Sequence, residues 1–142
     1  MADLKQRRPG PRLEAELERT AAFRTELRRF LHKTEVAALD AGLTAQRYDL
    51  LLMIKAAPDG SETSTVTRLC TSLDLRQSAV TELVKRAIEA GFVRREQSAS
   101  DGRVFVLRLT EDGEARLMGA FNALARERKA FVEAFRFLTD MI

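Results

Sequence analysis

Two short apolar patterns in the middle of the chain constrain its fold more than any other feature. Both place apolar residues at spacings of three and four, which is typical of one buried face on a short helix. The first pattern consists of Val66, Leu69, Cys70 and Leu73, and the second of Val80, Leu83, Val84, Ala87 and Ile88. Leu73-Asp74-Leu75 breaks the period between them, and Gly91 stands where a helix-ending glycine is common. The sequence therefore predicts two helices, over 64–73 and 77–90, joined by a tight turn.

The outer face of the second predicted helix is polar. Its residues are Ser78, Thr81, Glu82 and Lys85, with Arg76 and Gln77 at the start of the helix and Arg86 beside them. Gln and Arg side chains reach base edges, while Ser, Thr and Lys bind bases or phosphates. Two helices in this order form a helix-turn-helix, whose second helix enters the major groove of DNA. A polar helix face can equally be a solvated surface, so this stripe alone leaves both interpretations open.

A hairpin pattern follows the two helices. Residues 92–96 are predicted to form one strand and residues 104–109, rich in β-branched and aromatic residues, another, with the small polar loop 97–103 between them. A helix-turn-helix followed by a two-stranded hairpin is a winged helix, and an Arg-bearing hairpin can enter the minor groove. We expect Asp101 to orient Arg103 through a charge-assisted hydrogen bond, although Asp101-Gly102 is also a plain turn sequence. The predicted DNA-binding residues are Arg76, Gln77, Ser78, Thr81, Glu82, Lys85, Arg86, Arg94, Arg95, Ser100, Asp101 and Arg103.

This part of the chain resembles the MarR family of bacterial transcription regulators. The resemblance covers roughly residues 43–117, about half of the chain, and rests on an ordered set of motifs. They are Gly42-Leu43-Thr44, Leu75 with Ser78-Ala79-Val80-Thr81-Glu82-Leu83-Val84-Lys85-Arg86, Ala90-Gly91-Phe92-Val93-Arg94-Arg95, Ser100-Asp101-Gly102-Arg103 and Leu109-Thr110-Glu111-Asp112-Gly113. Three features depart from the family. Gly102 stands where a second basic residue is usual, the helix over 64–73 begins with the weakly helical Ser-Thr-Val-Thr, and the C-terminal part is short.

The resemblance implies a homodimer that binds a near-palindromic operator in double-stranded DNA, usually as a repressor. It also implies that the first and the C-terminal helices form the dimer interface, and that a pocket for a phenolic or other aromatic effector lies beside it. The predicted ligand-binding residues are Phe23, Phe30, His32, Tyr48, Met53 and Phe121. For each of them, core packing (or, for His32, a surface role) is the competing interpretation. Cys70 lies on an apolar stripe, which favours a packing role over redox sensing.

The flanking sequence predicts long helices on both sides of the winged helix. Apolar spacing indicates a helix over about 11–40, and Thr44 and Thr110 are expected N-caps of two further helices. Near the C-terminus a heptad seam consists of Leu117, Phe121, Leu124, Arg128, Phe131, Phe135 and Leu138. This seam either packs within the chain or interlocks with a second subunit, and we favour the second subunit. The expected organisation is a flexible basic tail (1–10), an N-terminal dimerisation helix (11–42), a winged helix-turn-helix (43–109) and C-terminal dimerisation helices (110–142).

Composition narrows the function classes. The chain has 142 residues and a net charge of +3, yet residues 76–103 alone hold six basic and four acidic side chains. One Cys and one His, without a nucleophile motif or phosphate-binding loop, argue against an enzyme, and we expect no metal or cofactor. With neither a signal peptide nor a membrane-length apolar run, we expect a cytoplasmic protein. The expected fold is mainly α with a small β-hairpin wing. The alternative function, a winged helix that binds protein, predicts an apolar outer face on helix 77–90.

Overall fold

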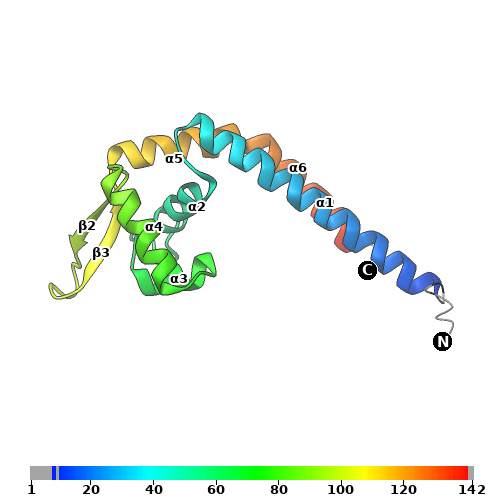
Figure 1. Ribbon diagram of the computed structural model, residues 1–142, viewed down its shortest axis with the longest axis horizontal. Helices are drawn as coiled ribbons and strands as arrows, with labels where there is room; N and C mark the ends of the chain where they lie inside the picture. Colours follow the sequence, from blue (N-terminus) through cyan, green and yellow to red (C-terminus); the bar gives the residue numbers. More distant parts are fainter. Residues whose placement is uncertain (1–7, 9, 141–142) are drawn as a thin grey trace, which may run out of the picture. The chain divides into compact units, whose positions relative to one another are not determined.

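The computed structural model describes residue 8 and residues 10–140 of the chain, and all its helices and its two longer strands are labelled in Figure 1. The chain divides into two compact units. The terminal unit contains the described residues up to Lys33 and from Ala125 onward, and the central unit runs from Thr34 to Leu124. The predicted flexible tail over 1–10 lies outside the described residues, apart from Arg8 and Gly10.

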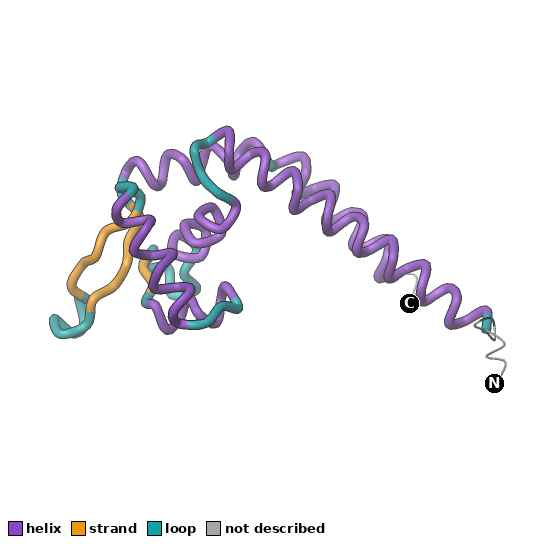
Figure 2. The backbone as a smooth tube through the Cα atoms, viewed as in Figure 1, coloured by secondary structure: helices purple, strands orange, loops and turns teal. Residues whose placement is uncertain are grey.

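The central unit contains most of the regular structure. The last turns of α1 (Pro11–Asp40) lead into α2 (Ala45–Lys55), β1 (Thr63–Ser64), α3 (Val66–Leu73), α4 (Gln77–Glu89), β2 (Val93–Gln97), β3 (Phe105–Leu109) and α5 (Glu111–Ala123). Figure 2 shows the two longer strands in orange, joined by a teal loop. The mainly helical fold with a small β wing, as predicted, is confirmed. The unit extends beyond the predicted range 43–109 at both ends, because it includes the end of α1 and all of α5.

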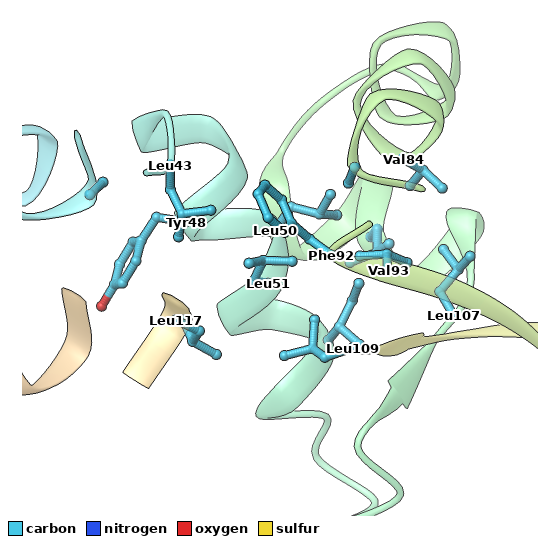
Figure 3. Close-up of a cluster of buried hydrophobic side chains, with 14 of the residues drawn as sticks. Leu43, Tyr48, Leu50, Leu51, Val84, Phe92, Val93, Leu107, Leu109 and Leu117 are labelled. Atoms are coloured by element: carbon cyan, nitrogen blue, oxygen red, sulfur yellow. The ribbon is translucent and has the colours of Figure 1, made fainter. Parts of the chain in front are cut away.

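The core of the central unit is built around α2. Leu50, Leu51 and Ile54 of α2 are completely buried, and Figure 3 shows the first two beside Phe92 and Val93. The run 50–54 of this helix is apolar throughout, as suits a segment that α3, α5 and the sheet all contact. Each such side chain stabilises the fold by about 1.5–3 kcal/mol relative to an exposed one. This core fixes the position of α4, whose Val80, Val84 and Ala87 face it.

The sheet has a third strand that the sequence pattern did not predict. Its order is β1-β3-β2, and both pairings are antiparallel. Thr63 and Ser64 pair with Arg108 and Leu107, so the prediction that a helix begins at 64 is wrong. The helix begins at Val66, and Thr65 is its N-cap, with its hydroxyl accepting a hydrogen bond from the backbone N–H of Arg68. The weakly helical Ser-Thr-Val-Thr sequence is therefore a strand end and a cap.

Polar caps and special backbone conformations end the other helices. Thr44 and Thr110 accept hydrogen bonds from the N–H groups of Arg47 and Gly113, as expected of N-cap residues. Asp74 has a left-handed conformation with φ of 52°, which closes α3 and makes the tight turn into α4. Gly91 follows α4 with φ of 82°, which glycine adopts without strain.

The terminal unit consists of the first part of α1 and α6 (Ala125–Asp140). Phe30 stacks on Phe131 with ring centroids 4.8 Å apart, and Phe23 meets Phe135 edge-on at 5.6 Å. No side chain of the described residues 10–33 and 125–140 is buried. The predicted heptad seam is divided at Leu124, the C-cap of α5: Leu117 and Leu124 are buried in the central unit, whereas Phe131, Phe135 and Leu138 belong to the terminal unit.

None of the described helices is long and apolar enough to span a membrane.

Candidate nucleic-acid interface

The two faces of α4 differ sharply. Val80, Val84 and Ala87 are buried against the core, whereas the positions that point away from it are exposed and polar. All twelve residues predicted to bind DNA belong to the central unit and are exposed. The structure therefore leaves their side chains accessible on α4 and the hairpin. Their role in DNA binding stays a prediction.

The N-terminal end of α4 is open. Arg76 is its N-cap and makes no side-chain capping hydrogen bond, so the side chain does not close the first turn. Farther along, Arg86 Nε donates to Glu82 Oε1 at 3.0 Å, one turn apart on the exposed face. This pair restrains Arg86 and places a carboxylate in the middle of the polar stripe. A carboxylate there can accept a hydrogen bond from the amino group of cytosine.

One face of the wing carries an ionic cluster centred on Glu96. The register places Arg94 directly opposite Arg108, an arrangement that is unfavourable for like charges. Glu96 resolves it, because Arg94 Nη2 donates to its Oε1 at 2.7 Å and Arg108 Nε donates to its Oε2 at 2.9 Å. The hydrogen bonds from Arg108 and Arg94 hold the pKa of the Glu96 carboxyl below its ordinary value. Sequence analysis did not single out Glu96, although its spacing of two from Arg94 on a strand places both on one face.

The other two arginines of the wing are less restrained. Among the described residues, neither Arg95 nor Arg103 forms an ion pair. The expectation that Asp101 orients the Arg103 side chain is corrected, because Asp101 Oδ1 accepts from the backbone N–H of Arg103 at 3.0 Å. Asp101 thus closes the turn at the tip of the hairpin, the plainer of the two interpretations that the sequence left open. The guanidinium groups of Arg95 and Arg103 remain available for a ligand.

Phe92 joins α4, the wing and α5. Its ring is buried, with the guanidinium carbons of Arg116 and Arg47 at 5.1 and 5.9 Å from its centroid. Its carbonyl oxygen accepts from the N–H of Thr110 at 3.0 Å. A Cβ atom on Gly113 would lie 2.1 Å from the same oxygen, so only glycine permits this approach. The wing is therefore held against the base of α5 by backbone contacts as well as by apolar packing.

The six residues predicted to bind an effector are divided between the two units. Phe23, Phe30 and His32 belong to the terminal unit, and Tyr48, Met53 and Phe121 to the central unit. Phe23 and Phe30 pack on aromatic rings of α6, and His32 is exposed. Tyr48 is buried, with its hydroxyl directed away from the leucine cluster (Figure 3), while Met53 and Phe121 are half-buried against the core. The ligand assignment stays a prediction.

Cys70 is half-buried on α3 and packs against the core, in agreement with its place on the apolar stripe. Among the described residues, no cluster of His, Cys, Asp and Glu side chains could hold a metal ion.

A helix-turn-helix whose second helix presents a polar face beside a basic β hairpin defines a winged helix-turn-helix protein. Residues 41–104 match the sequence model of the MarR family. Over this stretch, which lies within the central unit, the chain is similar to the MarR family of winged helix-turn-helix transcription regulators. This family consists of regulators rather than enzymes.

Solved structures with the same fold extend the comparison. A mutant MarR from E. coli complexed with operator DNA is 18% identical with a TM-score of 0.61, over 84% of this chain and 78% of that one. The M. tuberculosis transcriptional regulator MOSR in complex with DNA is 25% identical with a TM-score of 0.58, over 78% and 77%. The transcriptional repressor CouR bound to a DNA duplex is 24% identical with a TM-score of 0.60, over 77% and 73%. No curated protein sequence matches the chain.

Proposed function

We propose that the chain is a transcriptional repressor that binds a near-palindromic operator in double-stranded DNA as a homodimer. The observation that carries this proposal is the exposed polar face of α4 beside the wing arginines, with the opposite face of α4 buried. In this arrangement α4 reads base edges in the major groove, and the wing contacts the adjacent minor groove. An outer face of this polarity is not what a protein-binding winged helix needs.

Charge supports a nucleic-acid partner over a protein partner. Residues 76–103 hold six basic and four acidic side chains, and two of the acids, Glu82 and Glu96, pair with arginines of the same surface. Of the arginines in this range that form no ion pair among the described residues, Arg76 lies at the start of α4, and Arg95 and Arg103 lie on the wing. Phosphate contacts made by such groups displace counterions from DNA, which favours association.

The composition of the terminal unit supports the homodimer. Leu17 and Leu31 are each 54% exposed and Phe137 is 66% exposed, while no described residue of this unit is buried. Two helices with apolar surface of this kind need a further partner to exclude water, and a second copy supplies two more helices. A dimer also presents two α4 helices, which reach successive major grooves when they lie about 34–36 Å apart.

The proposed protein represses transcription and acts in the cytoplasm. A dimer bound across a promoter excludes polymerase, and CouR, whose fold is similar, is a transcriptional repressor. Because the operator belongs to bacterial DNA, the protein acts in the cytoplasm.

The proposal includes release from the operator by a small aromatic ligand. Its support lies in grooves within each unit. Phe23 lines a groove of about 380 Å³ in the terminal unit, and Met53 lines one of about 590 Å³ in the central unit. An aromatic body covered by such side chains, with one polar tip, is the chemistry that these grooves accept. A panel of aromatic acids and phenols, scored by the rise in melting temperature and the loss of operator binding, tests this part separately.

The direct test is DNA selection followed by a salt titration. Genomic fragments retained by the full-length protein identify the operator, and fluorescence anisotropy then gives its affinity at 50 to 200 mM salt. We expect the affinity to fall by about 10³–10⁵ over this range if six to ten phosphates are contacted. No retained fragment, or a flat salt response, would contradict DNA binding and favour the protein-binding alternative.

A matched pair of arginine variants tests the wing. Arg103→Ala should weaken operator binding by about 5- to 150-fold, because it removes one contact worth about 1–3 kcal/mol. Arg24→Ala removes an exposed arginine from the terminal unit and should leave the affinity within about twofold. An unchanged affinity for Arg103→Ala, with an unchanged melting temperature, would remove the wing from the binding surface.

A further inference from the structure

The wing carries a large apolar side chain that the fold itself does not use. Phe105 is 60% exposed and its neighbour Val104 is 43% exposed. The other aromatic side chains of the central unit, Tyr48, Phe92 and Phe121, are buried or half-buried. Phe105 is the first residue of β3 and directly follows the tip loop, where Ser98 N–H donates to Val104 O at 2.8 Å. Phe105 itself pairs with Gln97 of β2, so the ring is carried by an ordered strand rather than by the loop.

The register of the hairpin shows which face carries this ring. Phe105 pairs with Gln97, Arg95 with Leu107, and Val93 with Leu109. Directly opposed residues share a face, and alternate residues of one strand return to that face. Phe105 and Arg95 therefore lie on the same face of the hairpin as the buried Val93, Leu107 and Leu109. Near the tip of the hairpin this face extends beyond the core, and its side chains are exposed. The ionic cluster of Arg94, Glu96 and Arg108 occupies the opposite face.

Two unpaired arginines flank the ring. Arg95 is its diagonal cross-strand neighbour, and Arg103 precedes it by two residues at the tip. Neither forms an ion pair among the described residues, in contrast to Arg94 and Arg108. A narrow minor groove has an enhanced negative potential that attracts such guanidinium groups. The wing thus combines two unpaired guanidinium groups with an exposed apolar ring, and the register places one of them, that of Arg95, on the face of the ring.

This combination is the one that architectural DNA-binding proteins use. They place arginines in the minor groove and insert an apolar side chain between two base pairs, which unstacks the step and bends the duplex. We propose that Phe105, flanked by Arg95 and Arg103, acts as an apolar wedge in the minor groove of the operator and bends it. The inference rests on the proposed function and deepens it, since it assigns a DNA-deforming role to a residue outside the predicted contact set. It also implies a preference for a flexible pyrimidine–purine step beneath the wing.

The test uses the full-length protein and its selected operator. Energy transfer between dyes at the two ends of the duplex measures bending, and 2-aminopurine at the step beneath the wing reports unstacking. Wild-type protein should shorten the end-to-end distance and raise the 2-aminopurine fluorescence. Phe105→Ala should still bind, about 3- to 30-fold more weakly, but should lose both signals. Phe105→Leu keeps an apolar wedge and should restore most of the bend.

Val106→Ala is the matched control, because Val106 lies on the opposite face of the same strand. It should leave bending and unstacking unchanged, and both alanine variants should keep the wild-type far-UV spectrum. Binding without bending, or a Phe105→Ala variant that bends the operator as the wild type does, would overturn this inference alone. A change in oligomeric mass on Phe105→Ala would overturn it in favour of a protein contact. If the wild type binds no DNA at any salt concentration, the proposed function fails first and this inference with it.

Discussion

The two units of the chain solve the problem of burying apolar surface in different ways. In the central unit α2, α3, α4, α5 and the sheet enclose a continuous cluster in which Leu50, Leu51 and Ile54 are completely buried. In the terminal unit the helices α1 and α6 meet through phenylalanine rings, and no described side chain there is buried. One unit therefore completes its own core, whereas the other leaves apolar surface exposed, which in the proposed homodimer is covered by the second copy. The comparison predicts that changes in the two units have different consequences.

The largest expected effect comes from charging the exposed surface of the terminal unit. Phe137→Glu replaces an apolar ring, which is 66% exposed in the single chain, with a carboxylate. We expect the dimer to dissociate and the operator affinity to fall by about 100-fold or more, because two linked half-sites bind with an avidity that one lacks. Light scattering after size exclusion gives the mass, and anisotropy gives the affinity.

Phe137→Leu is the control for that experiment, since it keeps an apolar side chain and should remain dimeric. Phe137→Glu should lower the operator affinity much more than it lowers the melting temperature of the central unit. A Phe137→Glu variant that remains dimeric would break the comparison, because the exposed surface would then have no partner chain.

A smaller effect is expected from a pair of glycines in α5. Gly113→Ala forces a Cβ atom to within 2.1 Å of the backbone oxygen of Phe92, so the wing and α5 must separate. Overpacking of this kind costs about 1–3 kcal/mol. Gly119→Ala adds the same methyl group to the same helix with no atom within 4 Å, and should raise the stability by about 0.5–1 kcal/mol. Urea unfolding of both variants measures the difference. Equal changes in the free energy of unfolding would show that the close contact at Phe92 does not affect stability.

The smallest effect separates two threonines. Thr110 caps α5 and also donates from its hydroxyl to Gly91 O at 2.6 Å, so Thr110→Ala should cost about 1–2 kcal/mol. Thr20 of the terminal unit is exposed and donates only to the carbonyl oxygen of Glu16 within α1. Thr20→Ala should change the free energy of unfolding by less than about 0.5 kcal/mol. If Thr20→Ala proved the more costly of the two, the terminal unit would be more tightly packed than its exposure indicates.

Local signals account for the elements that the sequence predicted correctly. The bounds of α1, the caps at Thr44 and Thr110 and the end of α4 before Gly91 all depend on residues within one or two turns. The apolar spacing over 80–88 also predicted the buried and exposed faces of α4, and with them the accessible positions of the candidate site.

The features that the sequence did not predict depend on pairing between residues far apart in the chain, or on which of several charged neighbours a side chain contacts. β1 has only two residues, too few to show a period, and it exists because Arg108 and Leu107 pair with it. The seam over 117–138 has one period, but its halves belong to different units, and no local pattern marks Leu124 as a helix end. Glu96 pairs with both Arg94 and Arg108, a choice that depends on the register of the hairpin.

The thiol of Cys70 can report the local opening of α3. The chain contains one cysteine, and it is half-buried on α3 against the core of the helix-turn-helix. A thiol reagent too bulky to enter that packing reacts only when α3 separates locally, so its labelling rate follows the population of the opened form. No engineered cysteine or dye is needed, and the readout comes from the element that positions α4. Comparing the labelling rate with and without operator would show how far DNA suppresses that opening in the native protein.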